Sequence, residues 1–293
     1  MVDSLPGGKM IEKFKGDTTN PTQTPGTIFT SDMIYTMANI SALVKGTKWY
    51  LGVPMNDTNN LRLEIAQVGE AILGDNLLGL QVGNEPDLYG RHSFGGRSQD
   101  YSPQDYFNEF GKVMDAINND QSIPVKNIIV GPSVSAGQWS PDVVFSTGYI
   151  DAYTNNLGFL AVEQYVSFLH DDSQYVLIVN SYPDDNCFAQ FGGAGSPKVV
   201  QDEFPKYLDH SACKDLVSPF LSASATALAH NKPFLMFETN TASCGGFPGI
   251  SDSFGAALWG LDYGLQMAYS NFSGALLHIG GQNVYYNVSE PRI

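Results

Sequence analysis

The chain is poor in basic residues and in long apolar stretches, and each shortage excludes a class of function. Its 15 lysine and arginine residues are outnumbered by 30 aspartate and glutamate residues, which gives a net charge of −15 over 293 residues. A surface of this sign repels nucleic acid and anionic membranes, so we expect neither as a partner. No apolar run reaches about 18 residues, so no membrane-spanning helix is predicted.

Cysteine and histidine are also scarce. The three cysteines and five histidines do not show the spacing of metal ligands. No glycine-rich phosphate loop follows a predicted strand, so we expect neither a metal nor a cofactor. Cys187 and Cys213 flank a loop-rich stretch and are able to pair, whereas Cys244 is expected to be a buried free thiol.

The residues that are present predict one α/β domain. A hydrophobic content of 43% over this length is enough for a large core. Strand and helix signals alternate along the chain, which predicts a parallel sheet. The predicted strands cover 49–54, 77–83, 127–132, 159–165, 232–240 and 273–279, and the predicted helices cover 30–44, 61–72, 102–117, 141–155, 216–230 and 253–269.

The triplet Asn84-Glu85-Pro86 is the most informative motif. It ends the apolar run 77–83, which is typical of a strand buried on both faces. Pro86 cannot donate a ladder hydrogen bond, so the strand stops and Glu85 lies at its carboxyl end. In α/β barrels that end carries the catalytic residues. The alternative is a solvated glutamate in a strand-terminal turn.

A second carboxylate occupies the equivalent place in a later strand. Glu238 ends the apolar run that begins at Lys232. Retaining glycosidases need two carboxyl groups about 5–5.5 Å apart, one as acid/base and one as nucleophile. A separation of roughly 150 residues between Glu85 and Glu238 fits strands four and seven of a barrel.

Four stretches around these carboxylates resemble one known family. They are 80–89, 237–246, 251–254 and 259–262. The chain is similar over nearly its whole length to glycoside hydrolase family 79, the β-glucuronidase and heparanase family of clan A, and above all to its fungal members. The resemblance implies a retaining hydrolase that releases β-linked glucuronic acid from glycans or glycosides. Glu85 would be the acid/base and Glu238 the nucleophile.

The resemblance also implies residues that bind the substrate. Asn84 would bind the sugar 2-hydroxyl, although a turn-stabilising asparagine is the alternative. Tyr165 would orient the nucleophile, with Tyr182 as a rival. The backbone N–H groups of a glycine pair would hold the uronate carboxylate, unless the pair is simply a flexible turn, and three residues after the last strand would add further contacts. These residues are Gly245 and Gly246, then Gly281, Gln282 and Tyr285.

Aligned with the family, the chain is an incomplete TIM-type (β/α)8 barrel over residues 1–293. Strands three to eight are present, whereas strands one and two and the accessory β-sandwich are missing, so both ends look truncated. Residues 166–182 look inserted, either as a loop over the active-site face or, as we favour, as a gene-model artefact. Within them, 175–179 has strand-like composition and competes with 159–165 for the sixth strand.

Acceptor sequons at Asn39, Asn56, Asn271 and Asn287 predict a secreted protein, although no signal peptide is visible after Met1. Two other functions remain open from the sequence. One is a clan A retaining glycosidase for a neutral sugar, and the other is a non-catalytic carbohydrate-binding fragment. Trp139, Trp259 and Tyr89 are candidates for stacking on sugar rings, with Trp259 favoured as a core residue.

Overall fold

A six-stranded parallel sheet forms the centre of the computed structural model, which describes residues 4–5, 27–90, 97–164, 199–242 and 246–278. Its strands pair in chain order, each with the next. They are β3 (Trp49–Val53), β4 (Leu77–Val82), β5 (Ile129–Val134), β6 (Leu157–Glu163), β7 (Phe234–Thr239) and β8 (Phe272–Leu277). The short strands β1 (Ser4–Leu5) and β2 (Thr27–Ile28) form a separate pair. Every strand predicted from the sequence is therefore confirmed.

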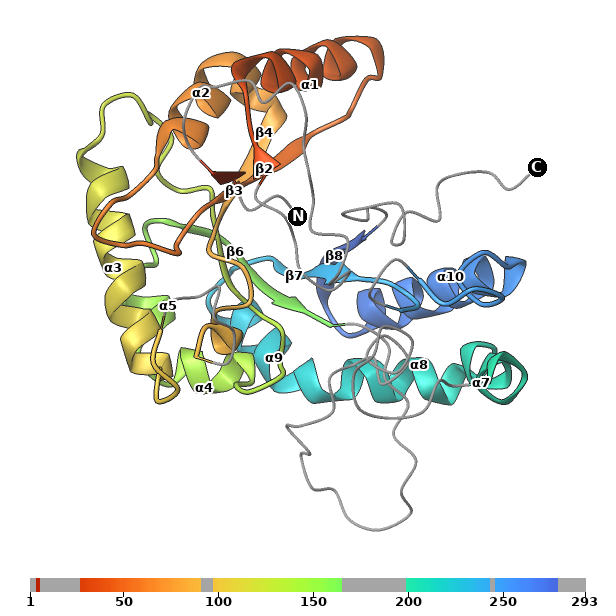
Figure 1. The fold of residues 1–293 in the computed structure, drawn as a ribbon. Coiled ribbons are helices and arrows are strands. Elements are labelled where there is room, and N and C mark those ends of the chain that lie inside the picture. Colours follow the sequence, from red (N-terminus) through yellow and green to blue (C-terminus); the bar gives the residue numbers. More distant parts are fainter. Residues whose placement is uncertain (1–3, 6–26, 91–96, 165–198, 243–245, 279–293) are drawn as a thin grey trace.

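The helices lie along the outer side of the curled sheet (Figure 1). They connect successive strands, as in an α/β barrel. Their bounds are α1 (Ser31–Leu43), α2 (Glu64–Leu73), α3 (Pro103–Asn119), α4 (Pro141–Phe145), α5 (Tyr149–Ala152), α7 (Val200–Tyr207), α8 (His210–Val217), α9 (Leu221–Ala229) and α10 (Phe254–Tyr269), with short 3-10 turns η1 (Gly74–Asn76), η2 (Pro86–Leu88) and η3 (Ser218–Phe220).

Two helices predicted as continuous are each divided in two. The helix expected over 141–155 breaks between α4 and α5 at Gly148, whose φ of 86° is incompatible with a right-handed helix. The helix expected over 216–230 is interrupted by the turn η3, which contains Pro219. Proline has no N–H to donate and its ring crowds the preceding turn, so the α-helical pattern stops there.

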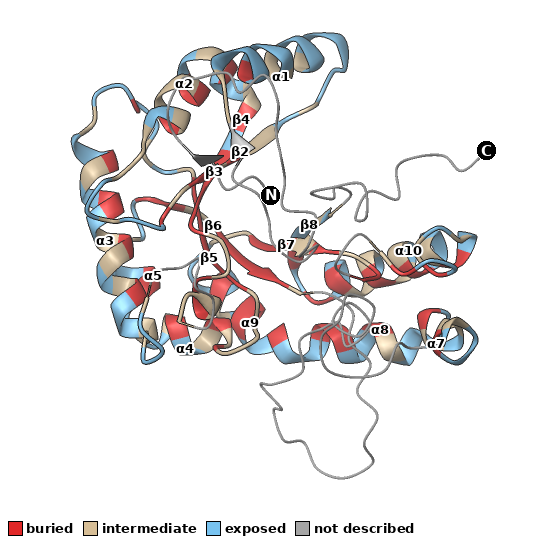
Figure 2. Ribbon diagram, in the orientation of Figure 1, coloured by how far each residue is buried: buried red, intermediate tan, exposed pale blue. Residues whose placement is uncertain are grey.

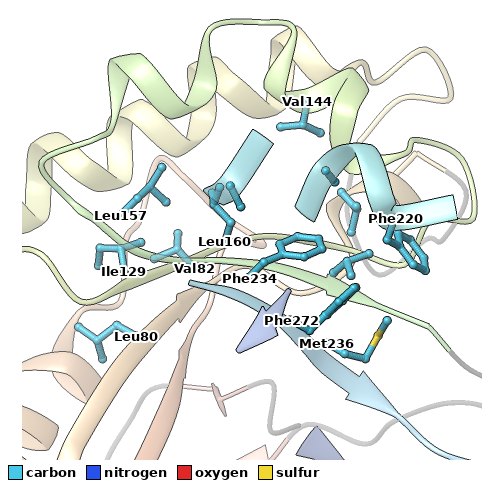
Figure 3. Packing of buried hydrophobic residues seen from close by; sticks show 14 of the residues in the cluster. Leu80, Val82, Ile129, Val144, Leu157, Leu160, Phe220, Phe234, Met236 and Phe272 are labelled. Atoms are coloured by element: carbon cyan, nitrogen blue, oxygen red, sulfur yellow. The ribbon is translucent and has the colours of Figure 1, made fainter. Parts of the chain in front are cut away.

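Apolar side chains fill two layers, one on each face of the sheet. The larger layer lies between the sheet and the helices, and Figure 3 shows Val82, Leu160 and Phe234 there. The strands in the centre are buried, whereas the helices are buried only on the side that faces them (Figure 2). This is the binary pattern that drives the packing of amphipathic helices onto a sheet.

The smaller layer lies on the inner face. Val130, Ala161, Leu235 and Phe237 are its buried members. The ring of Tyr50 on β3 lies 5.0 Å from that of Phe237 on β7, and these strands are not neighbours in the sheet. A flat sheet would hold them far apart, since neighbouring strands are about 4.8 Å apart. The sheet therefore curls around a filled interior, as in TIM barrels.

The sheet does not close within the described residues. β3 and β8 stand at its two ends, and each pairs with one neighbour only. The prediction of an incomplete TIM-type barrel with strands three to eight is thus confirmed. The suspected insertion at 166–182, with its strand-like part 175–179, lies outside the described residues.

One irregularity in β7 decides which way its last residues point. Val162 pairs with Met236, but the next residue, Glu163, pairs with Glu238. Phe237 is therefore an extra residue, which makes a β-bulge. Because side chains alternate along a strand and Met236 faces the helices, Glu238 would face them too without the bulge. In the bulge, Phe237 and Glu238 together oppose Glu163, and this turns Glu238 to the inner face.

Further expectations concern the cysteines, membrane-spanning helices and metal sites. Cys213 on α8 is a buried free thiol, and burial next to Asp262 raises its pKa to about 12. Cys187 and Cys244 lie outside the described residues. Within the described ranges, no helix is long and apolar enough to cross a bilayer, and no group of histidine, cysteine and acidic side chains is arranged to hold a metal ion.

Candidate active site

Three glutamates meet at the carboxyl end of the sheet. Glu85 follows β4, Glu163 ends β6, and Glu238 lies near the end of β7, where it pairs with Glu163. Glu163 is buried, with 1% of its surface exposed, whereas Glu85 and Glu238 are half-buried. The charges of Glu238 and Glu85 both act on Glu163, so the three carboxyl groups share one site. The sequence prediction that Glu85 and Glu238 lie at strand ends is therefore confirmed, and Glu163 was missed.

The backbone holds Glu85 in an unusual conformation. Its φ of 47° and ψ of 54° are left-handed, and its N–H donates to the carbonyl of Ser133 at 3.0 Å. Ser133 is itself an extra residue in β5, with a φ of 50°. Left-handed residues other than glycine cost about 1–3 kcal/mol each, and such strain concentrates at functional sites. The two strained residues lie side by side at the end where the carboxylates gather.

Asp87 fixes the loop beside Glu85. Its buried carboxylate accepts hydrogen bonds from the Ser135 N–H and hydroxyl, both at 2.8 Å, and from the N–H groups of Gly137 and Gln138 at 3.0 and 3.1 Å. Burial raises the pKa of Asp87, and these hydrogen bonds act against that rise. The carboxylate thereby holds the loop after β5 against the turn that follows Glu85. Its sequence signal was only its place next to Pro86.

Asn84 and Gln81 connect Glu163 to β4. The backbone N–H of Asn84 donates to the Tyr89 hydroxyl at 3.2 Å. The side-chain Nε2 of Gln81 donates to Glu163 Oε1 at 2.8 Å. Burial, and then the charges of Glu238, Glu85 and Asp87, hold the pKa of Glu163 well above its usual range. A carboxylate inside an otherwise apolar strand was the only signal in the sequence for Glu163.

His278 adds an imidazole at the end of β8. The backbone N–H of His278 donates to the Thr239 carbonyl at 2.9 Å, and the backbone carbonyl of His278 accepts from Asn240 Nδ2 at 2.5 Å. Burial lowers the pKa of His278, while the charge of Glu238 acts in the opposite direction. The imidazole is therefore biased toward its neutral form near Glu238. Sequence analysis did not single out this histidine.

Only some of the remaining predicted residues lie in the described part of the chain. Gly246 has a φ of 102°, which glycine alone adopts without strain. Trp259 is in the core as expected, and Trp139 packs against the same core with 9% of its surface exposed. Tyr165, Tyr182, Gly245, Gly281, Gln282 and Tyr285 lie outside the described residues.

Sequence comparison relates the chain to two fungal hydrolases, although no family model matches it. A curated β-glucuronidase from Aspergillus niger is 25% identical over 251 residues, which cover 82% of this chain and 42% of that protein. A β-glucuronidase from Neurospora crassa is 36% identical over 91 residues, or 30% of this chain and 16% of that protein. The chain thus spans less than half the length of these relatives.

A solved structure shares the fold. The 4-O-α-L-rhamnosyl-β-D-glucuronidase from Fusarium oxysporum superposes with a TM-score of 0.64 at 18% identity, covering 97% of this chain and 54% of that one. The comparison supports the partial TIM-type barrel. The chain is therefore similar to fungal β-glucuronidases over most of its length and shares the barrel fold of this solved structure.

Proposed function

We propose that the chain carries the catalytic site of a retaining β-glucuronidase that releases β-linked glucuronic acid from glycans or glycosides. The observation that supports this most is the gathering of Glu85 and Glu238 at the ends of β4 and β7. Both are half-buried, so each is open to a substrate on one side. Two such carboxyl groups are what a two-step displacement at an anomeric carbon requires.

In this mechanism Glu85 first donates a proton to the leaving oxygen while Glu238 attacks the anomeric carbon. The sugar is then bound covalently to Glu238. Glu85, now ionised, takes a proton from water, and the resulting hydroxide breaks the bond to Glu238 with a second inversion. The anomeric configuration is thus retained. Asn84, next to Glu85, would bind the 2-hydroxyl, where hydrogen bonds strengthen in the transition state.

Recognition of the uronate carboxylate must come from local donors, because the net charge of −15 repels an anionic substrate. We assign it to the backbone of Gly245 and Gly246, with Gly281, Gln282 and Tyr285 as further contacts. The positive φ of Gly246 fits a backbone that approaches a ligand without a Cβ in the way. Tyr165 is proposed to orient Glu238.

Trapping of the covalent intermediate tests the assignment. An activated 2-fluoro-glucuronide should label a peptide that contains Glu238, and Glu238→Gln should abolish the labelling. Glu203→Gln, which changes a glutamate on α7 outside the site, is the control and should still be labelled. A label on another residue, or inversion of the product anomer by NMR, would show that the assignment is wrong.

A neutral sugar in the same site is the first alternative, favoured by the acidity of the chain. The catalytic step would be unchanged, and only the glycine pair would lose its role. Rates on 4-nitrophenyl glucuronide and glucoside separate the two proposals. Faster cleavage of the glucoside would replace the uronate assignment.

A non-catalytic carbohydrate-binding fragment is the second alternative. It is favoured by the two ends of the sheet, β3 and β8, which have no further partner strand among the described residues. Calorimetric binding of glucuronate without any turnover of an activated glucuronide would establish it.

Secretion is proposed from the sequons. Asn39, Asn56 and Asn271 are exposed, as glycan attachment requires. A mobility shift of the secreted protein after enzymatic deglycosylation would support this proposal, and an unglycosylated intracellular product would contradict it.

A further inference from the structure

Glu163 is a buried acid that no step of the proposed reaction uses. Two amide side chains meet it on the inner face of the sheet. Gln81 Nε2 lies 2.8 Å from Glu163 Oε1 and 3.3 Å from Asn84 Oδ1. The Asn84 amide atom that faces Glu163 is 3.1 Å from both carboxyl oxygens. Gln81, Asn84 and Glu163 therefore form a closed triangle in which every pair is within hydrogen-bonding distance.

An ionised Glu163 cannot satisfy this triangle. A carboxylate only accepts, so both amides would have to present nitrogen to it. The amino groups of Asn84 and Gln81 would then face each other at 3.3 Å with no acceptor between them. Turning Gln81 as well would place its oxygen 2.8 Å from a carboxylate oxygen. Each arrangement leaves a repulsive pair in a buried place, where such pairs are most costly.

One proton on Glu163 satisfies the three contacts of the triangle. The acid O–H donates to Asn84 Oδ1, while Gln81 Nε2 donates to Glu163 Oε1 and, at longer range, to Asn84 Oδ1. No amide needs to turn. The Nδ2 group of Asn84 then points away from Glu163, and its two N–H groups donate no hydrogen bond within this triangle.

The surroundings favour the same proton. Glu238 on β7, Glu85 after β4 and Asp87 in η2 are acidic groups that act on Glu163, and each opposes a negative charge there. His278, which neighbours Glu238, is half-buried and biased toward its neutral form. A second negative charge among these carboxylates would cost free energy both in desolvation and in repulsion.

We propose that Glu163 is a positioning residue that stays protonated at the working pH and fixes the amide of Asn84, so that Asn84 offers N–H donors to the sugar 2-hydroxyl. This proposal rests on the proposed function for the identity of the sugar. The orientation of Asn84 rests on the triangle alone. It predicts that Asn84 recognises the 2-hydroxyl as an acceptor, so the enzyme discriminates against sugars that lack an acceptor at that carbon.

Two substitutions at Glu163 test the proposal kinetically. Glutamine copies a protonated glutamate, since its amide donates to Asn84 Oδ1 and its carbonyl accepts from Gln81. Glu163→Leu should lower kcat/KM for an aryl glucuronide at least about thirtyfold, and Glu163→Gln should rescue it to within about threefold of the wild type. The loss in Glu163→Leu should be non-additive with that of Asn84→Ala. Glu70→Gln, at a buried glutamate on α2, is the matched control.

A spectroscopic measurement keeps the test independent of activity. The infrared difference spectrum of wild type minus Glu163→Gln should contain the C=O band of a protonated carboxyl group, shifted in D2O. If glucuronides are not cleaved but the band is present, the proposed function fails and the protonation of Glu163 stands. The proposal is overturned if the band is absent, or if Glu163→Gln is as impaired as Glu163→Leu.

Discussion

The contribution of Glu85 to the rate depends on the leaving group, because only a poor leaving group must be protonated before it departs. Glu85→Gln should therefore cripple hydrolysis of alkyl or sugar glucuronides much more than hydrolysis of a dinitrophenyl glucuronide. Azide should restore the latter, because it is a nucleophile that attacks the intermediate without the help of a general base. Steady-state rates across a series of leaving groups check this. Equal losses for all of them would mean that Glu85 is not the acid.

Asp87 acts on stability rather than on the chemical step. In Asp87→Asn one carboxylate oxygen becomes an amino group that faces N–H donors of the loop 135–138. We expect the free energy of unfolding to fall by about 2 kcal/mol, since a buried charged acceptor is replaced by an unsatisfied donor. Asp215→Asn, on the exposed side of α8, should leave it unchanged. Chemical denaturation measures both, and two equal values would refute the role of Asp87.

The sequence predicts only some of these residues. Asn84, Glu85 and Glu238 follow apolar runs, and a run marks a strand end without any knowledge of its neighbours. Glu163 and Asp87 gain their roles from groups roughly 50 to 80 residues away, which local patterns do not contain. Glycine and proline disfavour helix, so the sequence itself contained the signal for the helix breaks at Gly148 and Pro219. The sequence contained no such signal for the pairing of Glu163 with Glu238, because a bulge can be recognised only once two strands are paired.

At the scale of elements, β4 depends on a glycine that faces the interior. A Cβ at Gly79 would lie 2.7 Å from both Tyr50 Cδ1 and Val130 Cγ2, the side chains that fill the inner layer. Gly79→Ala should lower the free energy of unfolding by about 1–3 kcal/mol through overpacking. Gly260→Ala on α10, where nothing lies within 4 Å, should instead be neutral or stabilising. Thermal unfolding of the two variants checks the contrast, and it fails if Gly79→Ala melts no lower than Gly260→Ala.

The outer face of α10 has an apolar stripe and no covering element in the described part of the chain. Its members recur at helical spacing, and Leu261 and Leu265 are 63% and 61% exposed. A helix that is apolar on all sides is normally buried. We expect the chain to self-associate through this stripe, so Leu261→Lys with Leu265→Lys should shift it toward monomer in sedimentation velocity. Leu208→Lys, at an exposed leucine after α7, is the control and should not.

At the scale of the whole molecule, the two sheet edges that have no partner strand in the described residues limit what the chain does by itself. Within these residues, β3 and β8 have backbone donors and acceptors that a closed barrel would pair. We predict that the 293-residue chain expressed alone is poorly soluble or inactive. Joining the barrel segment that precedes the matched region in a relative, and deleting 166–182, should recover glucuronidase activity. Robust turnover by the monomeric chain as given would contradict this.

The proton on Glu163 also makes folding depend on pH. The folded protein keeps a proton that the unfolded chain releases above the ordinary carboxyl pKa of 4.5, because burial and acidic neighbours raise the folded pKa. The folded state thus binds more protons between the two values. Stability is full below 4.5 and falls as pH rises toward the folded pKa. Denaturation at several pH values should show this slope in the wild type and a shallower one in Glu163→Gln, and identical slopes would rule it out.

The bulge at Phe237 makes that residue unnecessary for the direction of Glu238. Losing the single codon for Phe237 would place Glu238 directly after Met236, and the alternation of a regular strand would still turn it to the inner face, opposite Glu163. The chain would lose the ring of Phe237, which lies 5.0 Å from that of Tyr50 in the inner layer. In a collection of alleles, an in-frame deletion here would therefore act through packing, as would a missense change at the same codon that removes the ring.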